Sequence, residues 1–183
     1  IARSLLEAGP LLSADGSDSL SLDEALELLT VTGWDLTPAL LAAIPEALAL
    51  RRAPHPHVAT LQRRTAGFLA PWDGPAAIVF ADGRRVGALV DRNGLRPAAF
   101  AVTADRLVAV ASEAGAVPFK SAETVRRGRL GRGELLLVEP GRRRILEDAE
   151  AKTHALRTLP IHDAARADVD DRLEAGSAAR RPT

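Results

Sequence analysis

The sequence predicts an α+β fold in which two or three helices come first and antiparallel strands follow. Two observations support this prediction: apolar residues recur at helical spacing up to about residue 50, and short apolar runs separated by turn residues begin at about residue 77. Helices that are segregated from strands along a chain are typical of layered α+β proteins. The chain has 183 residues, of which 46% are hydrophobic, so it is long and apolar enough to bury a core.

Two helices are predicted in the first quarter of the chain. The first starts with Ser21 as its cap, in a capping-box pattern, and Gly33 ends it. The second is capped by Thr37 and is interrupted by Pro45, because proline cannot donate a helical hydrogen bond. The next segment, residues 51–70, has two prolines near its start and is predicted to be a loop.

Short strands joined by turns are predicted from residue 77 onward. Glycine, aspartate and proline separate the apolar runs, as they do in β-hairpins. Residues 123–127 are predicted to form a short helix that Gly128 ends. The predicted strands are residues 77–80, 86–90, 99–102, 107–111, 135–138 and 144–146.

The composition excludes several classes of function. The 24 basic and 24 acidic side chains give a formal net charge of zero, which argues against a nucleic-acid partner or a polybasic membrane anchor. No apolar run approaches the ~18 residues of a membrane span. The chain has no cysteine, so disulfides, thiolate metal sites and a cysteine nucleophile are excluded within it. We therefore expect a cytoplasmic protein without a membrane partner.

The two ends of the sequence suggest a piece of a longer polypeptide. The chain opens at Ile1 and contains no methionine, whereas a translated protein normally starts with one. Beyond about Glu150 the pattern loosens into alanine and charged residues, and the last residues resemble a linker. We therefore expect an internal segment that ends in a linker.

One polar segment, Asp91–Pro97, lies between two predicted strands. Its Asn93-Gly94 pair supplies the positive φ that a tight turn requires, and Pro97 ends the turn. We interpret the segment as a structural loop whose arginines pair with neighbouring acids.

The order of the motifs carries more information than any one of them. The chain contains "GSDSLSLDEALELL", "IPEAL", "PWDGPAAIVFADG", "DRNGLRPAAFAVTADRLVAVASEAGAV" and "GRLGRGELLLVE" in that order. From about Gly16 to Asp148 it resembles the glutaminase domain of the large subunit of glutamate synthase, a class II glutamine amidotransferase. Trp72–Pro75 and Pro45–Ala47 are similar to glutamate synthase in particular, whereas Asp91–Pro97 is shared with other class II amidotransferases.

The resemblance implies a fold, a reaction and cofactors. The fold would be part of the αββα sandwich of N-terminal-nucleophile hydrolases, with residues 1–150 as the C-terminal part of the glutaminase domain and residues 151–183 as a linker. In this family an N-terminal cysteine attacks the side-chain amide of glutamine. The released ammonia is transferred reductively to 2-oxoglutarate at a second site that uses FMN and an iron–sulfur cluster. We expect neither cofactor in this chain itself.

One substrate-contacting position of the family maps onto this chain. Asp18 matches the aspartate that binds the α-ammonium group of glutamine, and Ser17 and Ser19 could orient it. The alternative is that Asp18 is only a cap or turn residue. The cysteine, the asparagine and glycine of the oxyanion hole and the carboxylate-binding arginine have no match, so the isolated chain is predicted to be inactive. Asn93-Gly94 follows the Asp18 segment and is therefore not the oxyanion pair.

Two other functions remain open from the sequence. One is the glutaminase domain of another class II amidotransferase, and the other is a non-catalytic domain that binds glutamine or a protein. In the leading interpretation the partners are glutamine, the rest of the large subunit, and a small subunit or ferredoxin as electron donor. His55-Pro56-His57 is too short to predict a metal site.

Overall fold

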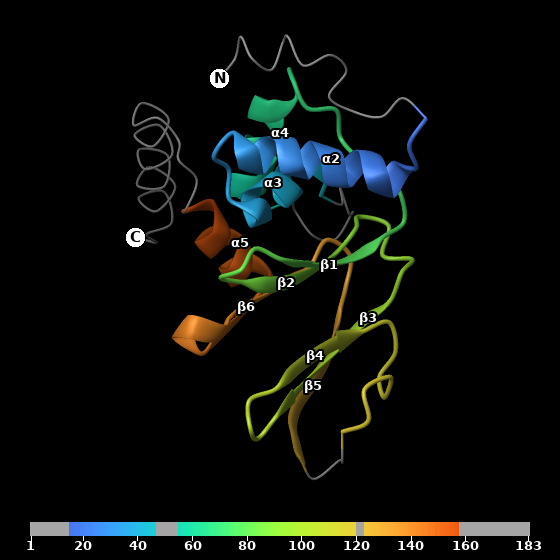
Figure 1. Cartoon of the computed structure of the whole chain (residues 1–183), viewed down its shortest axis with the longest axis vertical. Coiled ribbons are helices and arrows are strands. Elements are labelled where there is room, and N and C mark those ends of the chain that lie inside the picture. Colours follow the sequence, from blue (N-terminus) through green and yellow to red (C-terminus); the bar gives the residue numbers. More distant parts are fainter. Residues whose placement is uncertain (1–14, 47–54, 120–122, 158–183) are drawn as a thin grey trace, which may run out of the picture.

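A layer of helices covers one face of a four-stranded antiparallel sheet, and a three-stranded antiparallel sheet lies on the other side of that sheet (Figure 1). The structure is a computed structural model that describes residues 15–46, 55–119 and 123–157. It confirms the predicted α+β class, with three helices before the strands and one after them. The helices are α2 (Asp18–Val31), α3 (Leu36–Ala43), α4 (Pro56–Thr65) and α5 (Asp148–Leu156). The strands are β1 (Ala77–Ala81), β2 (Val86–Val90), β3 (Ala98–Thr103), β4 (Val108–Ala111), β5 (Thr124–Leu130), β6 (Leu135–Glu139) and β7 (Arg144–Glu147), with a short 3₁₀ turn, η2 (Pro140–Arg142), between the last two.

Both predicted helix starts were placed too late. Helix α2 begins one turn before Ser21, because Ser17 is its N-cap and the Ser17 hydroxyl accepts the Leu20 amide at 3.3 Å. Helix α3 begins one residue before Thr37, with Asp35 at the cap position. The predicted end of α2 is confirmed, since Gly33 follows it with φ +102°, which glycine tolerates best.

Two segments were assigned to the wrong structure. Within the predicted loop 51–70, residues 56–65 form α4, because Pro56 occupies the first helical position, where no amide is needed. The predicted helix 123–127 is instead part of β5, which pairs along β3. Gly128 lies inside this strand, where a Cβ atom would come within 2.5 Å of the Phe100 ring.

The strands form two sheets, with the orders β1-β2-β6-β7 and β4-β3-β5. The three predicted hairpins, β1–β2, β3–β4 and β6–β7, are all present as antiparallel pairs. The pairing of β2 with β6 and of β3 with β5 joins strands that are distant in sequence. The chain therefore passes twice between the sheets, once after β2 and once after β5.

The two crossings lie side by side. Residues 91–97 lead from β2 to β3, and residues 131–134 lead from β5 to β6. The Gly133 amide donates to the Asp91 carbonyl at 3.1 Å, and the Val90 amide donates to the Glu134 carbonyl at 3.2 Å. These hydrogen bonds tie one crossing to the other.

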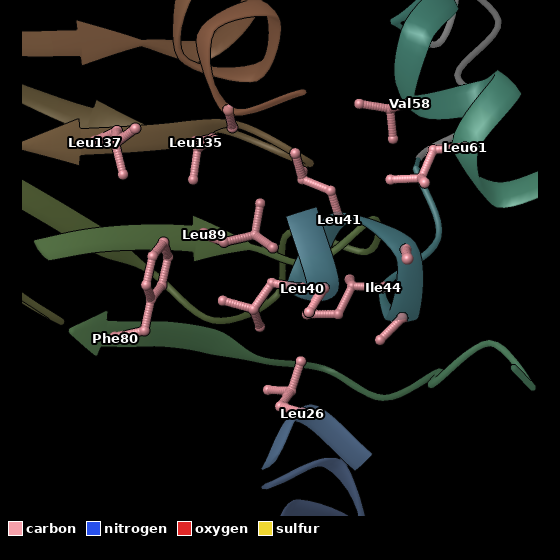
Figure 2. Packing of buried hydrophobic residues seen from close by; sticks show 14 of the residues in the cluster. Leu26, Leu40, Leu41, Ile44, Val58, Leu61, Phe80, Leu89, Leu135 and Leu137 are labelled. Atoms are coloured by element: carbon pink, nitrogen blue, oxygen red, sulfur yellow. The ribbon is translucent and has the colours of Figure 1, made fainter. Parts of the chain in front are cut away.

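The apolar core has two parts. The larger part lies between the helices and the four-stranded sheet, where α3 supplies Leu40 and Leu41 and the strands supply Leu89, Leu135 and Leu137 (Figure 2). The smaller part lies between the sheets, and Phe100 of β3 packs there with residues of β2, β5 and β6. The described residues thus form three layers: the helices, the four-stranded sheet and the three-stranded sheet. This arrangement is consistent with part of an αββα sandwich.

Helix α5 extends the folded region beyond residue 150. Residues 151–156, expected to begin a linker, are helical, and Ala151, Lys152 and Ala155 are buried, with α5 packed against β6, β7 and α4. The remainder of the expected linker, residues 158–183, lies outside the described residues, so the division into residues 1–150 and 151–183 stays a prediction. Within the described residues, no helix has the length and apolar character required to cross a bilayer.

Candidate functional site

Asp18 is the first residue of α2, and its side chain is exposed. Its neighbours Ser17 and Ser19 share a hydrogen bond between their hydroxyl groups, with the two oxygens 3.1 Å apart. The serines therefore bond to each other and to the helix start rather than to the aspartate. A carboxylate in this position is stabilised as an anion by the helix dipole. It is exposed to solvent and can accept hydrogen bonds from an ammonium group.

Trp72 contacts the first turn of α2 from a distant part of the sequence. Its indole Nε1 donates to the backbone carbonyl of Asp18 at 2.9 Å, and its own amide donates to the carbonyl of Ala43 at 2.8 Å. Its ring packs against the larger core. Such packing is expected of a large apolar side chain. The hydrogen bond to Asp18 was missed, because nothing in a single sequence pairs residues so far apart.

The polar segment Asp91–Pro97 is linked to the same region. The Asp91 carboxylate is buried and accepts the amides of Ala76 at 3.2 Å, Asn93 at 2.7 Å and Gly94 at 3.3 Å. These three hydrogen bonds to a buried carboxylate explain why an aspartate directly follows the apolar strand β2. Gly94 has φ +65°, as the predicted turn requires.

Arg92 confirms the expected pairing of this loop with an acid. Its Nε donates to Asp73 Oδ1 at 3.0 Å, and its Nη2 pairs with Asp73 Oδ2, so the contact is bidentate. Asp73 follows Trp72 directly. The motif "WDGP" is therefore connected to Asp18 on one side and to the loop Asp91–Pro97 on the other.

Two clusters of charged side chains lie elsewhere, on the helical side of the larger sheet. In one, Lys152 pairs with Glu46, next to His55. Burial, together with the charges of His57 and Lys152, lowers the pKa of His55 to about 4.

In the other cluster, Glu139 accepts hydrogen bonds from Arg85 and His154. Burial raises the pKa of Glu139, but the hydrogen bond and charge of His154, with Arg142 and Arg85, hold it below its usual value. Arg85 and His154 both bond to Oε1 of this buried carboxylate, whereas Oε2 has no hydrogen-bond partner among the described residues and lies 3.9 Å from Arg142. The cluster has the character of a structural network.

A hollow of about 340 Å³ lies on the outer face of the β4-β3-β5 sheet, away from Asp18. Its floor consists of alanines, with Phe119 and Arg127 also lining it. It contains none of the residues that connect Asp18, Trp72 and Arg92. Within the described ranges, no three histidine or acidic side chains gather as metal ligands would.

The chain belongs to the class II glutamine amidotransferases. The model of the family described as "Glutamine amidotransferases class-II" matches residues 1–163. This match includes Asp18, "WDGP" and Asp91–Pro97, which the structure connects, and it confirms the resemblance that these motifs suggested.

Individual relatives carry the name glutamate synthase. The chain is 38% identical over 156 residues to the ferredoxin-dependent enzyme of Pyropia yezoensis. It is 36% identical over 151 residues to the large chain of the NADPH enzyme of Bacillus subtilis, and 41% identical over 144 residues to the NADH enzyme of Schizosaccharomyces pombe. The matches cover 84%, 82% and 78% of this chain but only 10%, 10% and 7% of the relatives. The chain thus spans about a tenth or less of the length of the curated relatives it matches.

Proposed function

We propose that this chain is part of the glutaminase domain of a glutamate synthase, where glutamine is hydrolysed to glutamate and ammonia. In this proposal Asp18 binds the α-ammonium group of glutamine. The observation that carries it is the exposed carboxylate of Asp18 at the start of α2, whose backbone is held by Trp72. Membership in the class II amidotransferase family supplies the reaction class.

The chemical role of the chain is to bind and orient the substrate. An exposed carboxylate can form a charge-assisted hydrogen bond with an ammonium group, and this fixes one end of the amino acid. The chain has no cysteine, so the thiol nucleophile that the family uses is not among its residues. We therefore expect the 183-residue chain to show no glutaminase activity by itself.

FMN and an iron–sulfur cluster belong to the proposed parent enzyme rather than to this chain. Iron–sulfur clusters are held by cysteine thiolates, and this chain has no cysteine to supply them. We assign no residue of the chain to either group. The ammonia would be used for reductive transfer to 2-oxoglutarate elsewhere in the enzyme.

The contacts with the electron donor also lie outside this chain in our proposal. Relatives named for ferredoxin, NADPH and NADH are 38%, 36% and 41% identical to it. Similarity that does not depend on the donor argues that this region is common to all three kinds of enzyme. A small subunit or ferredoxin would therefore bind to other parts of the parent protein, which we place in the cytoplasm.

The test is to replace Asp18 with asparagine in the full-length enzyme and to measure glutamine hydrolysis. Asparagine keeps the size of the side chain but removes its charge. The loss of one charge-assisted hydrogen bond predicts a KM for glutamine raised by roughly 10- to 100-fold. Asp23→Asn is the matched control, because Asp23 is an exposed aspartate on the same helix.

The outcomes separate the possible functions. A raised KM for Asp18→Asn but not for Asp23→Asn supports glutamine binding by Asp18. An unchanged KM in both variants would show that Asp18 is only a helix-start residue. A parent enzyme that hydrolyses glutamine but does not form glutamate from 2-oxoglutarate would instead indicate another class II amidotransferase.

A further inference from the structure

We propose that Trp72 is a positioning residue for Asp18, and that the segment Trp72–Ala76 fixes the position and orientation of the Asp18 carboxylate. This inference rests on the proposed function, because it assigns a role relative to the ammonium-binding carboxylate. Trp72 does not contact the substrate in this proposal. It acts through the backbone of the residue that does.

Trp72 is fixed at three points. Its backbone amide donates to the Ala43 carbonyl at the end of α3, at 2.8 Å. Its ring lies beside Gly74, where an added Cβ atom would be 3.1 Å and 3.3 Å from two ring carbons. Its indole nitrogen donates to the Asp18 carbonyl at 2.9 Å. A side chain held in this way has little freedom, so its hydrogen bond defines where the first turn of α2 lies.

The rest of the segment is fixed by the loop that follows β2. Asp73 forms the bidentate pair with Arg92, and the Ala76 amide donates to the Asp91 carboxylate. The Asp91 amide in turn donates to the Ala76 carbonyl at 3.0 Å. Asp73 and Ala76 are therefore attached to structure outside the helical layer, whereas Trp72 is attached to α3 and α2 within it. Trp72 connects this structure to α2 through its hydrogen bond with the Asp18 carbonyl.

The indole N–H is the chemical feature on which the inference depends. A helix carbonyl has a second lone pair, so the Asp18 oxygen can accept the indole in addition to its helical hydrogen bond. Phenylalanine would retain most of the ring packing but has no donor. Without the donor, the first turn of α2 would lose this tertiary hydrogen bond and would fray more readily, since helix ends fray first.

The main experiment compares Trp72→Phe with Trp34→Phe in the full-length enzyme. Trp34 is the other tryptophan of the chain and packs against the same core, so the second variant is a matched control for lost indole packing. For Trp72→Phe we expect KM for glutamine to rise roughly threefold to tenfold, with kcat changed less than about twofold, because a positioning contact acts on binding. For Trp34→Phe we expect no change in either constant.

A second variant tests the same idea without removing the donor. In Gly74→Ala the Trp72 ring must give way by a few tenths of an ångström, and this strains its hydrogen bond to the Asp18 carbonyl. We expect KM to rise in the same direction, whereas Gly67→Ala, where an added Cβ atom meets nothing within 4 Å, should leave KM unchanged. If Trp72→Phe does not fold, Gly74→Ala decides the question.

The results distinguish this inference from the proposed function. If Asp18→Asn raises KM but Trp72→Phe and Gly74→Ala do not, Trp72 has no positioning role and the proposed function stands. If Trp34→Phe raises KM as much as Trp72→Phe, the effect is general packing and the inference is wrong. If Asp18→Asn itself has no effect on KM, the role proposed for Asp18 is wrong, and the inference about Trp72 fails with it.

Discussion

The ammonium group of Lys152 is buried against the carboxylate of Glu46. Only 6% of the Lys152 side chain and 9% of the Glu46 side chain are exposed to solvent. Asp148 lies on the other side, with its Oδ1 3.1 Å from the same nitrogen. The second oxygen of Glu46 accepts the backbone amide of His55, at the start of α4. One lysine thereby connects α5 to the end of α3 and the beginning of α4.

Removing this lysine should destabilise the chain strongly. Lys152→Met leaves Glu46 buried without its cation, and breaking a buried pair in this way costs about 3–5 kcal/mol. Arg144→Met is the matched control, because the Arg144–Glu150 pair is exposed and such pairs contribute less than about 1 kcal/mol. The free energy of unfolding from urea denaturation measures both. Equal effects of the two changes would contradict the structural role of Lys152.

The stability of the chain should fall between about pH 6.5 and pH 4 because of His55. Its pKa is about 4 in the folded chain, chiefly because of burial, whereas an unfolded histidine has a pKa near 6.5. In this interval the unfolded chain binds a proton that the folded chain does not, so acid favours unfolding. Above pH 6.5 both states are neutral at this residue and the effect is absent.

The pH effect can be isolated by substitution. His55→Gln should flatten the loss of stability between pH 6.5 and pH 4, measured as urea midpoints at several pH values. His57→Gln is the comparison, because the charge of His57 is a smaller cause of the shift than burial, and most of the slope should remain. A slope that is identical in the wild type and in His55→Gln would show that other groups produce it.

Replacing Asp91 should damage the corner between the sheets. Asp91→Ala removes the acceptor of three amides in a buried position, and we expect a loss of about 2–4 kcal/mol. Asp82→Ala is the control, because the Asp82 carboxylate is half-buried and accepts two amides in the turn between β1 and β2, and we expect a loss of about 1 kcal/mol. Thermal denaturation of both variants checks the difference. A smaller loss for Asp91→Ala than for Asp82→Ala would be inconsistent with the buried hydrogen bonds.

Gly87 should not tolerate a side chain. A Cβ atom there would lie 2.7 Å and 2.8 Å from carbons of the Phe80 ring on the neighbouring strand, and overpacking of this kind costs about 1–3 kcal/mol. Gly67→Ala should be close to neutral, since the space beside it is open. Combining Gly87→Ala with Phe80→Leu should recover part of the loss, because the two residues are in contact. Additive losses in the double variant would indicate that the ring is not the cause.

The hairpins could be predicted from sequence because their signals are local. Asp82-Gly83 lies between two apolar runs, and the structure places Gly83 at φ +80° in the turn that joins β1 to β2. The same reasoning located β6 and β7 on either side of Pro140-Gly141. In each case the residues that decide the structure are adjacent in the chain.

The errors occurred where distant contacts decide the structure. Residues 123–127 were predicted to form a short helix. Pairing with β3, together with the contacts of Arg126 with Glu147 and with the Phe100 ring, instead holds this segment in the strand β5. The burial of Lys152 had no local signal either, because its partner Glu46 is more than a hundred residues away. Tertiary contacts of this kind override local propensity.

The candidate site was predictable only in part. Asp18 was proposed from its family motif, and its role stays a prediction. Arg92 was expected to pair with an acid, although the identity of that acid, Asp73, required the structure. The hydrogen bond from Trp72 to Asp18 had no local signal. A single sequence shows which residues carry chemistry, whereas the fold shows which of them touch.

The paired crossings between the sheets have a mechanical consequence. Since both connections pass through one corner and are hydrogen-bonded to each other, the two sheets are joined along one side, where side-chain packing and the Arg126–Glu147 ion pair also hold them together within the described residues. A relative movement of the sheets would therefore be a rotation about this corner rather than a slide. Asp18 is connected to the corner through Trp72, Asp73 and Arg92, so such a rotation would be transmitted to the candidate site through these contacts.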